Sequence, residues 1–296
     1  TRDVSKSTYY RYINVLRSEK EDKKADKLYA TLLKKYPKEK IEEKLKNRIF
    51  LSPEVLGVSS VTLKNSKINS PYSDYKVSYL GEDKIVYSSS KETKSFLSTK
   101  SIWNNEAYTN LYESRFDGDG LIGEVSKLKG RINRFYNESS AVFTKDGKTM
   151  YFTRNNFIKG KKKKNKENEI ALKIYRAEFT NGKWDNVFEL PFNSDDFNCA
   201  HPALSKDDKT LYFSSNRPGS FGESDLFKVT VLDNFLFSEP ENLGTLVNTK
   251  SRESFPFVSN DDILYFSSDG HFGFGGLDVF GVALKNNTPQ GTVYNL

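Results

Sequence analysis

The sequence is poor in the residue types that most often build reactive or metal-binding sites. Its 296 residues contain one cysteine, Cys199, and two histidines, His201 and His271. A single cysteine excludes an internal disulfide and a cysteine-based zinc site, and it leaves the redox compartment open. The two histidines occupy different places in the repeat described below, so we interpret them as exposed loop or strand-edge residues rather than a catalytic pair. We therefore expect no enzymatic activity, no metal and no cofactor.

The sequence also lacks an apolar run long enough to cross a membrane, and its start at Thr1 does not resemble a signal peptide. Hydrophobic residues make up only 36% of the chain, yet 22 Phe and 17 Tyr are present. Aromatic residues in an otherwise polar chain favour strands that carry rings on a pleated face.

Positive charge exceeds negative charge, and the formal net charge is +7. Much of the excess is local, because residues 159–166 read KGKKKKNK. A charge run of this kind is usually a solvated loop, so it does not predict nucleic acid binding. We expect a mobile loop that contributes little to stability and that offers a candidate interaction surface at Lys161, Lys162, Lys163 and Lys164.

The first 52 residues predict a separate helical segment. Residues 1–50 contain no glycine, and Ile13 and Leu16 fall on one face at helical spacing. A second helix carries Ala25, Leu28 and Leu32 and stops before Pro37, and a third covers residues 39–50. The second helix resembles that of a tetratricopeptide repeat, although a plain helical hairpin is the alternative.

Residues 53–296 contain a repeated unit built around an aromatic strand. The unit recurs roughly every fifty to sixty residues, and its copies are residues 85–89, 150–153, 211–215 and 264–268. Each copy follows another strand and a tight turn, and in two copies the turn contains Asp146 or Asp207, a residue type that tolerates turn conformations. A third and a fourth strand follow each copy. The repeat predicts a mainly β fold, a propeller of four-stranded antiparallel blades.

We expect these four blades to belong to a larger propeller. Residues 61–65 resemble a fourth strand before the first blade, and residues 291–296 end the last blade with a similar strand. Because unpaired terminal blades expose an edge and an apolar face, we expect an open arc that a partner or a further segment closes.

Two carboxylates precede the third strand of the last two units. Asp225 and Asp278 each follow a glycine-rich loop, which contains Gly222 in one unit and Gly275 in the other. Such a carboxylate commonly accepts backbone N–H groups and fixes the loop. We interpret Asp225 and Asp278 as structural, with a metal or ligand role as the alternative.

The quoted motifs resemble a known family. HPALSKDDKTLYFSSNRPGSFGESDLF (residues 201–227) and ESFPFVSNDDILYFSSDGHFGFGGLDVF (residues 253–280) resemble the TolB-type, WD-repeat-like propeller motif. Together with the helices and INSPYSDYKVSYLGEDKIVYSSSK (residues 68–91), they resemble the periplasmic OmpA-family proteins of the Bacteroidetes, of the PorE type.

This resemblance implies a non-enzymatic periplasmic scaffold associated with the outer membrane, type IX secretion and gliding motility. The implied partner is an outer-membrane protein of the PorP/SprF kind. Peptidoglycan binding in that family belongs to an OmpA-like domain, which cannot be matched to any residue of this sequence. The alternative is a glycan-binding or glycan-hydrolysing propeller, which needs two carboxylates facing one cleft.

Overall fold

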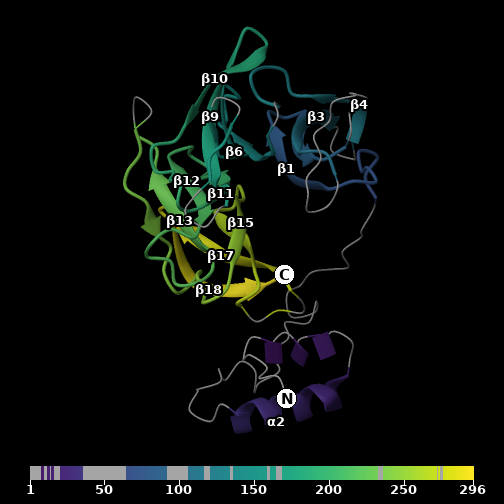
Figure 1. The fold of residues 1–296 in the computed structure, drawn as a ribbon, viewed down its shortest axis with the longest axis vertical. Helices are drawn as coiled ribbons and strands as arrows, with labels where there is room; N and C mark the ends of the chain where they lie inside the picture. Colours follow the sequence, from purple (N-terminus) through teal and green to yellow (C-terminus); the bar gives the residue numbers. More distant parts are fainter. Residues whose placement is uncertain are drawn as a thin grey trace.

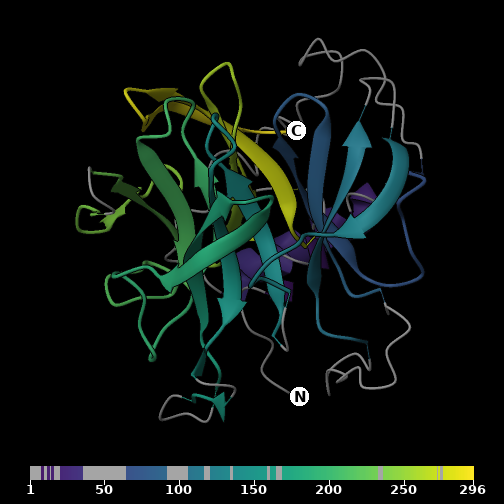
Figure 2. The ribbon, with the colours of Figure 1, turned by 90° about the horizontal axis from the view of Figure 1, so that it is seen from above.

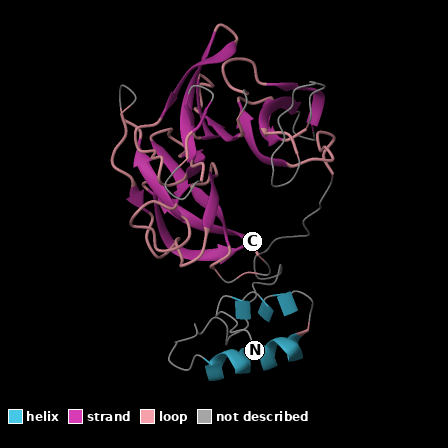
Figure 3. Cartoon of the chain, viewed as in Figure 1, coloured by secondary structure: helices cyan, strands magenta, loops and turns pink. Residues whose placement is uncertain are grey.

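The computed structural model describes residues 8–9, 12–13, 15–16, 21–35, 65–91, 106–116, 121–133, 136–158, 161–164, 169–232, 236–271, 273 and 276–296. Within these ranges the chain is mainly β, as the sequence predicts, and Figure 3 shows helix only in the N-terminal part. Helix α2 (Asp22–Lys35) corresponds to the second predicted helix, and its Ala25 and Leu32 are buried against Ile13 and Leu16. The third predicted helix lies outside the described residues.

The strands form four antiparallel sheets of four strands each, which confirms the four predicted blades. The first blade contains β1 (Asp74–Leu80), β2 (Lys84–Ser89), β3 (Asn110–Phe116) and β4 (Leu121–Lys127). The second contains β5 (Glu138–Phe143), β6 (Thr149–Asn155), β9 (Leu172–Thr180) and β10 (Lys183–Glu189). The third contains β11 (Cys199–Leu204), β12 (Thr210–Ser215), β13 (Asp225–Thr230) and β14 (Glu241–Asn242). The fourth contains β15 (Glu253–Val258), β16 (Ile263–Ser268), β17 (Asp278–Lys285) and β18 (Thr288–Asn295).

The blades follow one another in chain order around a common centre, as Figures 1 and 2 show. Their first strands are the inner ones, since β1 lies against β5, β5 against β11, and β11 against β15. Hydroxyl groups join neighbouring blades: Ser140 N donates to Ser88 Oγ over 3.1 Å, and His201 N donates to Thr153 Oγ1 over 2.9 Å. The fold is therefore a β-propeller of four blades.

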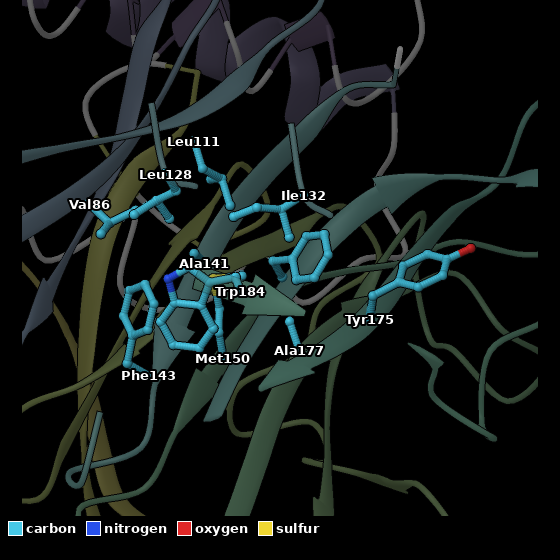
Figure 4. Packing of buried hydrophobic residues seen from close by; sticks show 11 residues of the cluster. Val86, Leu111, Leu128, Ile132, Ala141, Phe143, Met150, Tyr175, Ala177 and Trp184 are labelled. Carbon is cyan, nitrogen blue, oxygen red and sulfur yellow. The ribbon is translucent and has the colours of Figure 1, made fainter. Parts of the chain in front are cut away.

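Apolar side chains fill the space between consecutive blades. Between the first and second, Val86 and Leu111 pack with Phe143, Met150 and Trp184, as the close view in Figure 4 shows. Similar clusters join the second blade to the third and the third to the fourth. The second and third sheets thus bury both of their faces, which explains why the aromatic strand at the middle of each is apolar on successive residues.

An asparagine side chain binds the backbone of the third strand in three blades, and in the third blade this asparagine, Asn248, is buried. Asn248 Oδ1 accepts from Leu226 N at 2.7 Å, while its Nδ2 donates to Leu226 O at 3.0 Å and to Asn242 Oδ1 at 2.8 Å. Asn133 and Asn193 form the same pair of bonds to Leu111 and Ile174. Each of these asparagines therefore satisfies the backbone N–H at the start of a third strand and adds a second bond to a carbonyl that already accepts from a fourth-strand or loop N–H.

Replacing Asn248 with alanine leaves the buried N–H of Leu226 without a partner, whereas Leu226 O still accepts from Leu243 N at 3.0 Å. We expect Asn248→Ala to lower the free energy of unfolding by about 1 to 3 kcal/mol, measured by urea denaturation. The control is Asn260→Ala in an exposed turn, for which we expect a change within about 0.5 kcal/mol. Equal, small effects of the two substitutions would show that the Asn248 bonds contribute little.

Candidate functional site

Every inner strand has a β-bulge at the same position, and the residue there has a left-handed backbone. The register shifts lie at Tyr75/Ser78, Ser139/Val142, Ala200/Ala203 and Ser254/Phe257. The φ angles are 52° at Lys76, 52° at Ser140, 57° at His201 and 52° at Phe255. A bulge re-aims a side chain, so the repeat directs one residue of each blade toward its neighbours near the axis. We call Lys76, Ser140, His201 and Phe255 the axial cluster.

The axial cluster forms a chain of contacts from blade to blade. Ser140 Oγ lies 2.9 Å from His201 Nδ1, and the His201 ring lies 3.9 Å from the Phe255 ring, between centroids. Lys76 Nζ donates to the carbonyl oxygen of Pro256 at 2.8 Å, which links the first blade to the fourth. Contacts at the axis therefore connect all four blades.

The electrostatics of the cluster disfavour positive charge. Burial lowers the pKa of Lys76 to about 8. Burial, assisted by the nearby Lys76 ammonium, lowers the pKa of His201 to about 3. At neutral pH Lys76 is thus charged and His201 is neutral, so the two groups do not compete for a proton.

His201 lies on a first strand, β11, and His271 lies in the loop before β17, as the sequence predicts, but neither is as exposed as expected. His201 is half-buried among the axial contacts. His271 is half-buried against the rings of Phe266 and Phe280, and its Nε2 lies 2.7 Å from Val247 O. The sequence could not show this for His201, because the bulge residues share a backbone conformation but no residue type.

Ser140 and His201 form the hydrogen bond of a nucleophile and its base, which the sequence did not predict. A general base works best when its pKa lies near the operating pH, and a pKa of about 3 makes His201 a weak one. Ser140 is also completely buried. The geometry therefore suits a structural hydrogen bond better than attack on a substrate.

Asp225 lies where the sequence places it, before the third strand of its blade. Its carboxylate accepts from the backbone N–H groups of Phe221 at 2.7 Å and Gly222 at 3.1 Å, and from Asn242 Nδ2 at 2.7 Å. A Cβ at Gly222 would meet Ser251 O at 2.3 Å, so glycine lets two loops approach closely. The Asp225 carboxylate therefore uses its oxygens to hold its own loop in place.

The other aspartates of the predicted blade motif lie at the start of a third strand or in the turn between a first and a second strand. Asp278 begins β17 opposite Ser268, whereas Gly275 lies outside the described residues. Asp146 Oδ1 accepts from Thr144 Oγ1 at 2.6 Å and from Lys148 N at 2.9 Å, closing its turn. Asp207 forms the same bonds with Ser205 and Lys209 in the next blade.

The basic run differs from the expected solvated loop. Lys161–Lys162 form strand β8, which pairs with β7 (Phe157–Ile158). Exposed Lys163 forms an ion pair with Asp195, and Asp195 also binds Lys173 Nζ at 2.7 Å. Hydrogen bonds from Lys163 and Lys173 hold the pKa of the Asp195 carboxyl well below its usual range. An acidic residue distant in sequence thus anchors part of the run.

Large apolar side chains are exposed on the two sheet faces that no other blade covers. On the first blade Val77 is 52% exposed and Tyr79 is 59% exposed, whereas Phe143 and Leu204, which match Tyr79 in the next two blades, are 8% and 7% exposed. A cavity of about 230 Å³ lies over this face.

The last blade shows the same exposure. Val279 is 47% exposed and Phe257 is 46% exposed. The residues that match Val279 in the preceding blades are fully buried, namely Leu111, Ile174 and Leu226. The first and last blades therefore meet at the axial Lys76 contact without packing these faces together, and we call Val77, Tyr79, Phe257 and Val279 the open faces.

The described part of the chain contains no helix long and apolar enough to span a membrane. Among the same residues, no three histidine, cysteine, aspartate or glutamate side chains gather as metal ligands would.

No family model and no curated protein matches the chain. Solved structures of similar fold include a putative TolB from Agrobacterium tumefaciens, with 16% identity, a TM-score of 0.41, and coverage of 72% of this chain and 60% of that one. A prolyl endopeptidase shares 16% identity with a TM-score of 0.36, over 74% of this chain and 27% of that one. A thermostable family-43 glycoside hydrolase shares 12% identity with a TM-score of 0.43, over 74% of this chain and 72% of that one.

The chain spans 27%, 60% and 38% of the length of the first three similar structures. At these identities and TM-scores the likenesses carry no argument, and the β-propeller rests on the strand topology described above.

The Lys76 ammonium is costly to keep in its surroundings, because burial opposes its charge. We expect Lys76→Met, which keeps the length of the side chain, to raise the free energy of unfolding at pH 7 by about 1 to 3 kcal/mol. Unfolded Lys76 keeps its proton up to about pH 10.5, whereas in the folded protein its pKa is about 8. The cost is therefore complete below pH 8 and disappears as the pH rises to 10.5.

Urea denaturation of the wild type and of Lys76→Met at pH 7 and at pH 10 measures this difference. We expect the two proteins to converge at the higher pH. A variant that is less stable than the wild type at pH 7 would show that the Lys76 hydrogen bond outweighs the cost of its burial.

Proposed function

We propose that this protein is a non-enzymatic scaffold whose open faces bind a protein partner. The observation that carries the proposal is the exposure of Val77, Tyr79, Phe257 and Val279 at positions where the matching residues of other blades are buried. Contiguous exposed apolar side chains on a soluble domain mark interaction surfaces. Three junctions between blades already show that such faces bind other sheets.

The axis favours binding over catalysis. His201 is a weak base beside a buried Ser140, and Asp225 is occupied with backbone groups of its own loop. A glycan hydrolase needs two carboxylates flanking one bond, and the four residues of the axial cluster include none.

The resemblance to the PorE-type proteins suggests the cellular setting. We propose a location in the periplasm at the outer membrane, with a partner of the PorP/SprF kind. Leu33 on helix α2 is 37% exposed and adds an apolar contact in the helical part of the chain. The proposal thus gives the chain two binding surfaces and no reaction.

Photocrosslinking in the native cell tests the partner. A photoreactive phenylalanine analogue replaces Phe257 in one variant and Tyr79 in another, which keeps an aromatic ring on each open face. We expect both variants to form a crosslink to the same outer-membrane protein, identified by mass spectrometry. The matched control carries the analogue at Phe221, which is 51% exposed in a loop of the third blade. Crosslinks to that protein from Phe221 alone, or no crosslinks from the open faces, would contradict the proposal.

The absence of catalysis is tested separately on the purified chain. We expect no turnover of a broad panel of glycoside, ester and peptide substrates at pH 7, because His201 is too weak a base to activate Ser140. The measurement is product formation with time, compared with buffer alone. Turnover that disappears in Ser140→Ala, or on changing Asp225 or Asp278, would identify an enzyme.

A further inference from the structure

Lys76 differs from the other inward-facing cations of the propeller in its partners. Arg154 pairs with Glu138 at 3.1 Å, Lys173 pairs with Glu189 at 2.7 Å, and Arg176 pairs with Glu178 at 2.8 Å. Lys76 Nζ instead donates to a neutral carbonyl, and no carboxylate of the described residues forms an ion pair with it. A cation that is partly removed from water without a counter-charge attracts an anion.

His201 supplies a second hydrogen-bond donor beside this cation. The Ser140 hydroxyl can donate to His201 Nδ1, which makes Nδ1 the acceptor of a neutral imidazole and leaves the proton on Nε2. No hydrogen bond from a described residue occupies Nε2. Lys76 Nζ lies 2.8 Å from the carbonyl oxygen of Pro256, and Pro256 follows Phe255, whose ring lies against the His201 ring. The ammonium and the imidazole thus lie beside the same two residues of the fourth blade.

The remaining features suit a ligand that enters from solvent. Lys76, His201 and Phe255 each remain partly exposed, so a ligand can reach them. The Phe255 ring offers an apolar wall next to the imidazole. Non-glycine residues held at positive φ store strain, and strain of this kind concentrates at functional sites.

We propose that the axial cluster is a binding site for a carboxylate, with Lys76 and His201 Nε2 each donating to one carboxylate oxygen. A carboxylate fits because it is planar, has two acceptor oxygens and carries the single negative charge that would balance the Lys76 ammonium. The ligand is either an acidic side chain of a bound peptide or a small free carboxylate. The site extends the proposed function, since a partner on the open faces lies beside the axis and can place such a side chain there.

The two histidines make the site easy to observe. In protein labelled with ¹⁵N-histidine, His201 reports on the axis and His271 provides an internal reference away from Ser140 and Lys76. Four probes are titrated at pH 7: acetate, the peptide acetyl-Gly-Asp-Gly-amide, its neutral match acetyl-Gly-Asn-Gly-amide, and inorganic phosphate. We expect the His201 signals to shift with acetate, with the aspartyl peptide, or with both, and not with the asparaginyl peptide.

The substitution Lys76→Met removes the counter-charge, and we expect it to weaken binding at least tenfold. The matched control is Lys206→Met, because Lys206 Nζ also donates to a backbone carbonyl, Asn260 O at 2.7 Å, but at an exposed site. Lys76→Gln serves as a second variant, and unchanged His271 signals show that each variant is folded. Lys206→Met is expected to bind as the wild type does.

The outcomes separate the two sources of the carboxylate. Binding of the aspartyl peptide without acetate identifies a peptide side chain, and binding of acetate identifies a small free carboxylate. The proposal is overturned if no probe shifts His201, if Lys76→Met responds as the wild type does, or if inorganic phosphate binds as tightly as the carboxylates. The titration uses no partner protein, so its result is independent of the crosslinking experiment.

Discussion

Each sheet of this protein has two apolar faces, and a sheet can bury both of them only between two other sheets. The second and third blades meet this condition, as the buried clusters around Trp184, Phe213 and Phe266 show. The first and last blades do not, because they approach each other at Lys76 and Pro256 while leaving Tyr79 and Val279 exposed. Stability and proposed function therefore have one origin: the same packing that holds three junctions together leaves the fourth able to bind.

The axis follows a different rule from the junctions. Apolar packing repeats from blade to blade with similar residues, whereas the four bulges repeat only in backbone geometry and carry Lys76, Ser140, His201 and Phe255. The same bulge with a different side chain in each blade can vary the surface at the axis while the scaffold stays the same. The uncompensated charge of Lys76 costs stability in the free protein, and this cost is the reason to infer an anionic ligand.

The repeat made the blades predictable, because hydrophobic alternation and turn aspartates such as Asp146 and Asp207 act locally and recur at regular spacing. Long-range contacts were not predictable. His201 lies on the predicted strand, but its contact with Ser140 was not predictable, since nothing in the sequence marks the bulge that turns it inward. Lys163 and Lys164 are exposed, as expected of a solvated run, but the ion pair of Lys163 was not predictable because Asp195 is distant in sequence. The role of the run as an interaction surface remains a prediction. The tetratricopeptide interpretation and the further blades remain predictions.

The central claim is that the first and last blades expose faces that every other junction buries. Hydroxyl-radical footprinting of the purified chain, read residue by residue by mass spectrometry, measures this directly. The structure predicts fast modification of Tyr79 and Phe257 and slow modification of Phe143 and Leu204, which match Tyr79 in the next two blades. Equal protection of Tyr79 and Phe143 would mean that the first and last blades pack together in solution, and the account of the open faces would be wrong.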